Sequence, residues 1–442
     1  MKTNKDLKIY FLFLIIFYIF IFYRSPEIFI NGRYFAEEGA IWWSYSLEND
    51  ILSTLFFSPS SGGYFCMICN LQILVTKFLP LAYGPIFTAV SSLLIFTLPS
   101  FLFIFLNRKY IDKTSIIGIS ILLIILPSMN FLEVFANSIS SPQYLAISIF
   151  IILLYGLKDE YLLKFQYFVI FVGFLSYYYS LFLLPCFIIK YYFQKNKILK
   201  LPIYFGVFAS FVHLNVLFYL VTQNSFYYRN FSSALDYTKV QNIISHSFTI
   251  NIFTEKYYKE PLFKYLVVFI FIIFLFMYFK RFLKNDFYII LVAFISQVVL
   301  IYFGQIGDTY YGRYAVVAST LTLFIFFEMI KSRLVFKLFF SILFLSSIYN
   351  FYVQGGSYFI ECSEYCIPWN EQLNNISNNL TDKYIHWPMG EGEPYWFTDK
   401  INPKPNPSPY QKSVLGQEYL ELYDLNFLDV LKNNLNYIKN LS

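Results

Sequence analysis

Two adjacent carboxylates, Glu37 and Glu38, lie in a short polar stretch directly after the first apolar segment of the chain. A carboxylate that is held near a hydroxyl group in a partly dry site can act as a general base. Neighbouring side chains on a helix point about 100° apart, so the two groups cannot face one cavity equally. Arg33 precedes Glu37 by one helical turn and can pair with it, which makes Glu38 the first candidate base and Glu37 the reserve. A solvated loop with ordinary acidic residues is the alternative.

A second polar group, residues 307–314, forms a short connection between two apolar segments and contains Asp308 and Arg313. Arg313 begins the following apolar segment, at the depth of lipid headgroups, where a guanidinium group can make bidentate contacts with a lipid phosphate. The alternative is an interfacial arginine that pairs with Asp308.

A third polar loop, residues 126–144, carries Glu133, Asn137 and Gln143. Their side chains could form hydrogen bonds with the hydroxyl groups of a sugar. Polar residues are common in loops at a membrane surface, however, so the ordinary loop interpretation is favoured for these three.

The histidines and cysteines show no spacing typical of a zinc site, so no structural metal is expected. Cys362 and Cys366 lie in a predicted extracytoplasmic tail, where the compartment allows a disulfide. Cys66 and Cys69 form a second close pair near the predicted membrane interface. For both pairs a disulfide and a reduced pair of thiols remain open.

The composition indicates the surroundings in which these residues must act. Hydrophobic residues make up 57% of the chain and charged residues 14%, the mean hydropathy is +0.53, and apolar runs about as long as a bilayer is thick recur along the sequence. The runs are too long and too uniformly apolar for outer-membrane barrel strands, so we predict an all-α polytopic membrane protein embedded in the lipid bilayer. The net charge of +6 is a modest excess that the positive-inside rule explains, and no nucleic acid is expected as a partner.

Basic clusters between the apolar segments predict the membrane topology, because cytoplasmic loops carry an excess of Lys and Arg. Residues 165–194 are barely long enough for two full spans and are predicted to form a short or re-entrant hairpin with its turn near 176–180. Residues 64–80 are predicted to form an interfacial helix. Together with the hairpin, the remaining segments predict about nine to eleven transmembrane helices. The predicted spans are 9–24, 83–106, 114–129, 144–157, 201–222, 262–279, 287–304, 313–330 and 335–353.

The composition changes sharply after the last predicted span, where Gly, Asn, Cys and Pro replace the apolar runs. We therefore predict a transmembrane domain over 1–353 and a small extracytoplasmic α/β appendage over 354–442. Within the appendage the pattern predicts helices near 369–380 and 417–440 and a strand at 383–387. The appendage is too small to bury a large core of its own, so we expect it to lean on the membrane domain.

These motifs resemble those of the GT-C superfamily of glycosyltransferases, which use polyprenyl-phosphate sugars. The family includes protein O-mannosyltransferases, lipid A aminoarabinose transferases and bacterial O-antigen-modifying glucosyltransferases, and it has an acidic motif in its first outer loop. Residues 36–39, Ala-Glu-Glu-Gly, are similar to the Ala-Glu-Asp-Gly form of bacterial relatives, with Glu in the place of Asp. The resemblance covers about residues 1–353 and continues through Gly62-Gly63-Tyr64, the Glu133–Asn137 loop and Gly312-Arg313-Tyr314.

The resemblance implies a GT-C-like helical bundle in the cytoplasmic membrane whose active face is extracytoplasmic. The implied reaction moves a sugar from a polyprenyl-phosphate donor to a glycan or glycolipid acceptor of the cell envelope, with inversion at the anomeric carbon. The family divides on the use of a divalent metal, and no Asp-x-Asp motif is present in the first loop, so no cofactor is assigned. The implied residues are Glu38 or Glu37 as the base, Arg313 and Arg229 for the lipid phosphate, and Asp308, Glu133 and Asn137 for the substrates.

Two other functions remain open at this point. An O-antigen polymerase is also polytopic, but such enzymes bind substrate through arginines in large outer loops, whereas the strongest motif here is acidic and lies in the first loop. A flippase or transporter of a lipid-linked saccharide predicts charged residues deep within the spans. The predicted spans of this chain contain few such residues.

Overall fold

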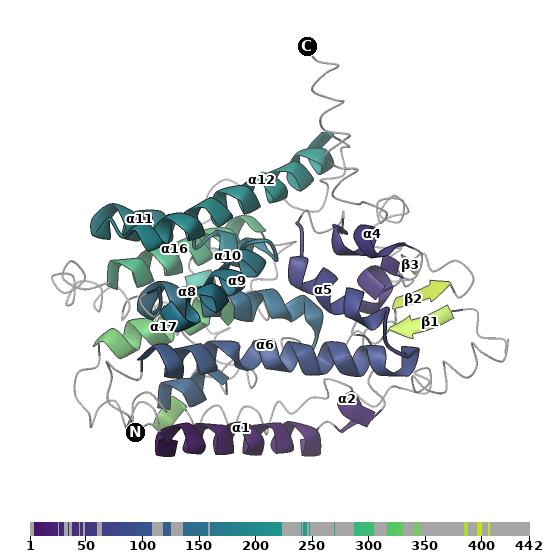
Figure 1. Ribbon diagram of the computed structural model, residues 1–442, viewed down its shortest axis with the longest axis horizontal. Coiled ribbons are helices and arrows are strands. Elements are labelled where there is room, and N and C mark those ends of the chain that lie inside the picture. Colours follow the sequence, from purple (N-terminus) through teal and green to yellow (C-terminus); the bar gives the residue numbers. More distant parts are fainter. Residues whose placement is uncertain are drawn as a thin grey trace, which may run out of the picture.

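The fold is that of a helical bundle, seen in a computed structural model of the chain (Figure 1). The structure describes residues 4–24, 26–30, 34, 38–43, 45–46, 49–59, 64–107, 118–124, 136–157, 160–222, 240, 242–244, 247, 269, 287–304, 316–329, 338, 341–343, 345, 384–387, 396–399 and 405–406.

Helices account for most of these residues. The first half of the chain contains α1 (Asn4–Arg24), α2 (Glu27–Ile30), the π-helix η1 (Glu38–Trp43), α4 (Ile51–Leu55), α5 (Met67–Thr76), the 3₁₀ turn η3 (Leu81–Tyr83) and α6 (Gly84–Asn107). The chain continues with the 3₁₀ turn η5 (Ser138–Ser140), α8 (Ser141–Tyr155), α9 (Glu160–Phe174), α10 (Tyr178–Leu181), α11 (Leu184–Gln194), the 3₁₀ turn η6 (Lys197–Leu199), α12 (Lys200–Thr222), α16 (Phe287–Gly304) and α17 (Val316–Met329).

Three helical segments in the described part of the chain are long and apolar enough to cross a membrane: Gly84–Asn107, Ser138–Tyr155 and Lys197–Tyr219. They correspond to the predicted spans 83–106, 144–157 and 201–222. The prediction of an all-α membrane protein is therefore supported at this coarse level. The predicted spans 9–24, 287–304 and 313–330 contain the shorter apolar helices Tyr10–Tyr23, Tyr288–Tyr302 and Val316–Ile325, while 262–279 and 335–353 lie almost entirely outside the described residues.

The predicted hairpin at 165–194 contains a sharp break. The helical segments Leu162–Phe174 and Tyr178–Gln194 are bent by 118° at the short connection between them. The break overlaps the predicted turn near 176–180, so that prediction is confirmed. The pair forms either one broken span or a re-entrant loop.

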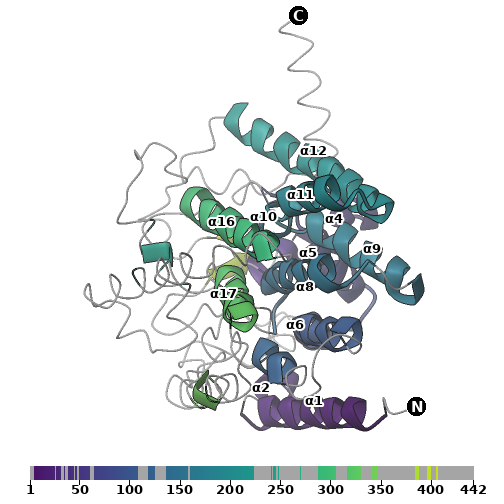
Figure 2. The same ribbon diagram turned by 90° about the vertical axis from the view of Figure 1, so that its left-hand side faces the viewer.

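Helix α8 occupies the centre of the bundle. Figures 1 and 2 show it between α6 on one side and α9 and α10 on the other, and α17 also packs against it. Residues 141–154 are all buried. A helix that is apolar all round is typical of the core of a bundle, and this burial means that both ends of α8 need partners inside the protein.

The outer helices present apolar side chains to the surroundings. On α1, Leu12, Ile15 and Ile19 are each more than half exposed, and α12 exposes Phe208 and Phe211 in the same way. Exposed apolar faces of this size are typical of surfaces that contact lipid. They agree with the prediction that the bundle is embedded in a bilayer.

Helix α5 lies in the segment predicted to be interfacial. Its ten residues extend over about 15 Å, half the thickness of a hydrocarbon core. It is therefore too short to cross the membrane.

The C-terminal region contributes a three-stranded antiparallel sheet in the order β1-β2-β3, formed by β1 (Tyr384–Trp387), β2 (Trp396–Asp399) and β3 (Pro405–Asn406). The predicted strand at 383–387 coincides with β1. The backbone of β2 lies beside η1. The expectation that 354–442 form an appendage that leans on the membrane domain stays a prediction. The predicted helices near 369–380 and 417–440 lie outside the described residues.

A candidate site at the amino end of helix α8

Glu38 is the first residue of η1 and is almost completely buried, with 1% of its surface exposed. Its Oε1 atom accepts a hydrogen bond of 2.9 Å from the backbone N–H of Ser138. These two residues are 100 positions apart in the chain. A π-helix is rare and often occurs at functional sites, and here it directs the acidic side chain toward the start of α8.

The residues around Ser138 form a favourable place for a negative charge. Asn137 has an extended backbone, and its Oδ1 atom accepts a hydrogen bond of 2.9 Å from Ser140 N–H, so it caps η5. Pro142 lies in the first turn of α8. Backbone N–H groups at the start of a helix lack partners within the helix and carry a partial positive charge. The Glu38 carboxylate supplies a partner of opposite charge.

A chain of buried polar groups leads away from this helix start. The Ser141 hydroxyl lies 3.5 Å from Asn137 O and 3.3 Å from the Ser92 hydroxyl. Gln72 Nε2 donates to Ser92 Oγ at 2.9 Å and to Ser91 Oγ at 2.8 Å. The chain connects α5, α6 and α8 by polar contacts in an otherwise apolar bundle, where each such contact is costly to leave incomplete.

Some atoms at this end of α8 have no hydrogen-bond partner in the described part of the protein. They are Ser138 Oγ, Gln143 Oε1 and Gln72 Oε1, all buried. Buried polar atoms are nearly always paired in native proteins. Such atoms also occur elsewhere in the described bundle, for example Gln166 Nε2. Ser138 Oγ, however, belongs to the residue whose N–H binds Glu38, so a further polar group could be received beside the carboxylate.

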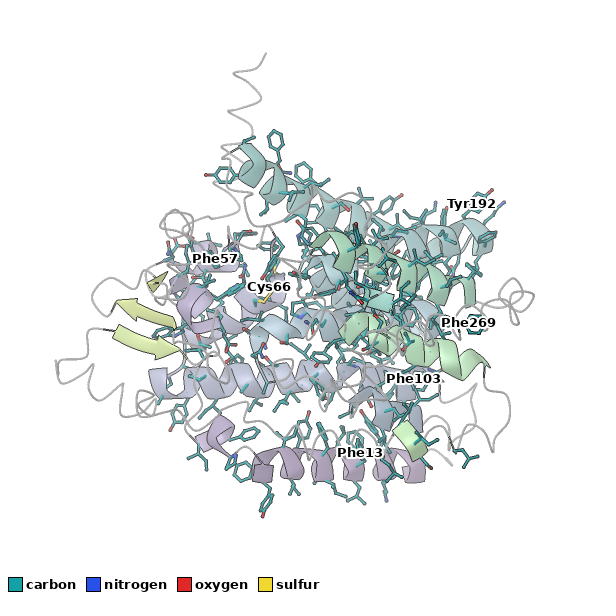
Figure 3. The ribbon with its side chains drawn as sticks, turned by 180° about the vertical axis from the view of Figure 1, so that it is seen from behind. Phe13, Phe57, Cys66, Phe103, Tyr192 and Phe269 are labelled. Atoms are coloured by element: carbon teal, nitrogen blue, oxygen red, sulfur yellow. A yellow bond between two sulfur atoms is a disulfide. The ribbon has the colours of Figure 1, made fainter. Side chains whose placement is uncertain are left out.

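Aromatic residues hold η1 in place. Trp42 Nε1 donates to Asn70 Oδ1 at 3.1 Å, and Asn70 Nδ2 in turn donates to Phe57 O at 2.7 Å and Leu55 O at 2.9 Å. One buried amide of α5 thus ties η1 to the end of α4. The position of Phe57 close to α4 can be followed in Figure 3.

Tyr34 packs under η1, with its ring 5.3 Å from the ring of Trp43. Burial raises the pKa of the Tyr34 phenol far above its usual value, and the negative charge of Glu38 raises it further. Its hydroxyl lies over Gly84, the first residue of α6, where a Cβ atom would collide with it. A side chain at position 84 would therefore force the buried Tyr34 ring to shift.

Cys66 and Cys69 form a disulfide at the start of α5 (Figure 3). This settles for the first pair the question that the sequence left open, whereas Cys362 and Cys366 lie outside the described residues. Cys69 Sγ lies 3.5 Å from the carbonyl oxygen of Ser138. The residue that binds Glu38 through its N–H thus contacts the disulfide through its carbonyl group.

The amino end of α5 docks onto the break after α9. Met67 N–H donates to Leu175 O at 3.1 Å, and Ile68 N–H donates to Ser176 Oγ at 3.1 Å. His213 of α12 joins the same junction, because its Nδ1 accepts from Phe65 N–H at 3.3 Å. The predicted turn of the hairpin therefore supports the helix that carries the disulfide.

The opposite end of α8 is closed by Lys190 of α11. Its ammonium group is buried and donates to the carbonyl oxygens of Leu153 and Leu154. Gln166 Oε1 accepts a hydrogen bond of 2.6 Å from Leu157 N–H just beyond the helix end. Sequence reasoning missed Lys190, although a lone lysine within an apolar segment is a signal that it has a partner or a task.

Of the residues predicted for the site, Glu38 and Asn137 are brought together. The side-chain oxygen of Asn137 accepts from Ser140 N–H, so Asn137 shapes the helix start, and its predicted substrate-binding role stays a prediction. Ser138 and Gln72 were not predicted, because nothing in their local sequence distinguishes them from other polar residues near spans. The other predicted residues lie outside the described part of the chain: Glu37, Arg33, Glu133, Arg229, Asp308 and Arg313.

Within the described residues no group of three or more His, Cys, Asp or Glu side chains could hold a metal ion. Comparisons of this chain with protein-family models, with curated proteins and with solved structures found no match. The chemistry of the site itself is therefore the basis on which its function is inferred.

Proposed function

We propose that this protein is an inverting membrane glycosyltransferase that moves a sugar from a polyprenyl-phosphate donor to a glycan or glycolipid acceptor on the outer face of the cytoplasmic membrane. The observation that carries the proposal is the buried Glu38 carboxylate, held at the start of α8 beside a chain of polar groups. The resemblance of residues 36–39 to the acidic motif of GT-C enzymes supports the same residue.

In the proposed reaction Glu38 takes the proton of an acceptor hydroxyl group. The acceptor oxygen then forms a bond to the anomeric carbon from the side opposite to the phosphate, and the bond between that carbon and the phosphate oxygen breaks. A carboxylate in a site with little water is suited to this proton transfer. Glu37 is the reserve base if the acceptor approaches from the other side of η1.

The departing lipid phosphate gains negative charge as the bond breaks. Arg313 and Arg229 are proposed to neutralise this charge, and such electrostatic stabilisation is often the largest part of catalysis. Asp308, Glu133 and Asn137 are proposed to contact hydroxyl groups of the substrates. No metal or other cofactor is required in this scheme.

The disulfide supports the proposed orientation of the site. Disulfides persist in oxidising compartments and are rare in the cytoplasm. The Cys66–Cys69 bond lies in the same connection, between α1 and α6, as Glu38. An extracytoplasmic position for this connection is the placement that the basic clusters predict.

A purely structural role for Glu38 is the main competing interpretation, since a carboxylate at a helix start stabilises the helix. Two substitutions of Glu38 distinguish helix capping from general base catalysis. In Glu38→Gln the amide oxygen can still accept the Ser138 N–H, but the group cannot act as a base. In Glu38→Ala both the hydrogen bond and the base are lost.

The test is an assay of the purified protein in nanodiscs with a panel of polyprenyl-phosphate sugars and a membrane glycolipid extract. We expect release of polyprenyl phosphate from one donor, no release by Glu38→Gln, and weaker donor binding by Arg313→Ala. Release that continues in Glu38→Gln, in Glu37→Gln and in the double variant would remove both carboxylates from the mechanism.

Absence of release across the whole panel would contradict the transferase. Binding of a lipid-linked oligosaccharide without release would then favour the polymerase or the flippase. Growth of the oligosaccharide on its lipid carrier identifies the polymerase, and movement of the intact lipid between leaflets identifies the flippase.

A further inference from the structure

Ser138 lies between the carboxylate and the disulfide. Its N–H donates to Glu38 at 2.9 Å, and its carbonyl oxygen lies 3.5 Å from Cys69 Sγ. All three residues are buried, each with 1% exposure or less. A movement of Cys69 Sγ must therefore displace Ser138, because a close-packed interior transmits small displacements.

The oxidation state of Cys69 decides whether a hydrogen-bond donor faces the carbonyl oxygen of Ser138. A disulfide sulfur has no hydrogen to donate, so the present contact is one of packing. A thiol is a weak hydrogen-bond donor, and reduction would place such a donor against the carbonyl oxygen. It would also release Cys69 from Cys66, so that the sulfur could rotate away from Ser138.

The helix start that carries the disulfide is held by contacts other than that with Ser138. Cys66 is the residue before the first turn of α5 and makes no side-chain cap hydrogen bond. The next two backbone N–H groups, of Met67 and Ile68, are bound by the break after α9. The cross-link thus joins a docked helix start to the residue that contacts Ser138.

We propose that the Cys66–Cys69 disulfide is a positioning element for Glu38, acting through Ser138, and that its reduction loosens the acidic site. In the reduction a small dithiol reductant supplies two electrons and two protons. The bond between the two sulfur atoms breaks, two thiols form, and the dithiol closes to its own disulfide. The catalytic consequence rests on the proposed function of Glu38, whereas the structural coupling does not.

Amide hydrogen exchange of the full-length protein in nanodiscs tests the coupling. In Cys66→Ser, which leaves Cys69 as a free thiol, we expect the Ser138 amide to exchange about tenfold faster, as for the loss of one hydrogen bond to a charged group. Amides of α16 and α17 should not change. Treatment of the wild-type protein with dithiothreitol, after thiol labelling has shown that the pair is reduced, should give the same pattern.

Cys186→Ser is the matched control. Cys186 is also buried, and its thiol contacts a backbone carbonyl, that of Ile289, at 3.8 Å, but it is free. This variant should leave Ser138 exchange unchanged. Unchanged Ser138 exchange in Cys66→Ser would overturn the proposal, and so would faster exchange spread evenly over α16 and α17, since that pattern is general unfolding.

The transferase assay provides a second readout. If Glu38 is the base, Cys66→Ser should lower kcat about tenfold and leave KM for the donor unchanged, because proton transfer is disturbed and donor binding is not. If the wild-type protein has no transferase activity but Cys66→Ser still loses Ser138 protection, the proposed function is refuted and the coupling stands. Full activity and full protection in Cys66→Ser refute the coupling and keep the function.

Discussion

The two ends of α8 are each closed by a charged side chain from another part of the chain, and their surroundings differ. At the amino end Glu38 accepts from Ser138 N–H, next to the polar chain that leads to Gln72. At the carboxyl end Lys190 donates to Leu153 O and Leu154 O. The signs of both charges match the helix dipole, negative at the start and positive at the end.

The difference between the two ends shows which of them needs a functional explanation. Both charges stabilise a helix whose ends are buried, so helix capping alone accounts for a carboxylate at one end and an ammonium group at the other. The amino end has in addition a disulfide and buried oxygen atoms, of Ser138 and Gln143, that lack partners within the described residues. Gln166 Nε2, near the Lys190 end, likewise lacks a partner within the described residues. What distinguishes the amino end is the disulfide and the polar chain from Ser141 to Gln72, and the proposed reaction would take place beside them.

Neutralising each charge in turn should separate the two ends of α8 most strongly. We expect Glu38→Gln to lower the rate of sugar transfer by about 10²- to 10⁴-fold, the usual contribution of a general base. Lys190→Gln should leave the rate constant of the folded fraction unchanged, since the carboxyl end takes no part in the reaction. Rates from the nanodisc assay, corrected for the folded fraction, provide the measurement.

Equal losses in the two variants would mean that both charges act only by stabilising α8. Glu38→Ala provides the control for capping. It should lower the thermal stability of the protein more than Glu38→Gln does, because it leaves the Ser138 N–H without its acceptor.

The sequence predicted the helices better than their contacts. Apolar runs such as 201–222 locate helices because a span needs about twenty apolar residues, and the break near 176–180 followed from a segment too short for two spans. Glu38 was recognisable because a carboxylate beside such a run is unusual. Its contact with Ser138 was not, because it joins distant parts of the chain.

The contact of Lys190 with the end of α8 could not be predicted from the sequence for a related reason. Helices that are apolar on all sides carry little periodic signal to show which face meets which neighbour. Backbone carbonyl groups leave no trace in the sequence at all, so a lysine that binds them looks unpaired. The rotation of α11 that brings Lys190 to the end of α8 is set by packing with α12 and α16.

Lys190→Met should give the largest loss of stability at the carboxyl end. Methionine has a similar length but no donor, so the carbonyl groups of Leu153 and Leu154 lose the Lys190 contacts. We expect the free energy of unfolding to fall by about 1–3 kcal/mol, as measured by denaturation in mixed micelles. Lys164→Met, on the exposed face of α9, is the control and should change it by less than about 0.5 kcal/mol.

Gly84→Ala tests the amino end by packing alone, without any change of charge. The new Cβ atom collides with the Tyr34 hydroxyl, and overpacking of this kind costs about 1–3 kcal/mol. Because Tyr34 supports η1, the Ser138 amide should lose protection from exchange. Gly206→Ala is the counterpart, since its Cβ atom meets Leu184 of α11, and it should disturb the Lys190 end instead. Loss of Ser138 protection in both variants would show that the two ends are not independent.

The smallest expected effect concerns Asp50, a second carboxylate at a helix start. Its Oδ1 atom accepts from Ser53 N–H at 2.7 Å, and this hydrogen bond lowers the pKa of Asp50. A lowered pKa means that the cap stabilises α4 at any pH above the ordinary carboxyl value of about 3.9 and is lost as the pH falls through the lowered value. The protection factor of the Ser53 amide should therefore decrease only under strongly acidic conditions.

Asp50→Asn separates capping from charge in this exposed cap, as Glu38→Gln does in the buried one. Asparagine caps about as well as aspartate but does not titrate, so in this variant Ser53 protection should stay constant over the same acidic range. A parallel decrease in the variant would show that another group causes the loss. If Ser53 protection stays constant, the amide caps as well as the carboxylate does. A loss of turnover in Glu38→Gln without a loss of Ser138 protection then reflects the chemistry of the carboxylate and not its capping.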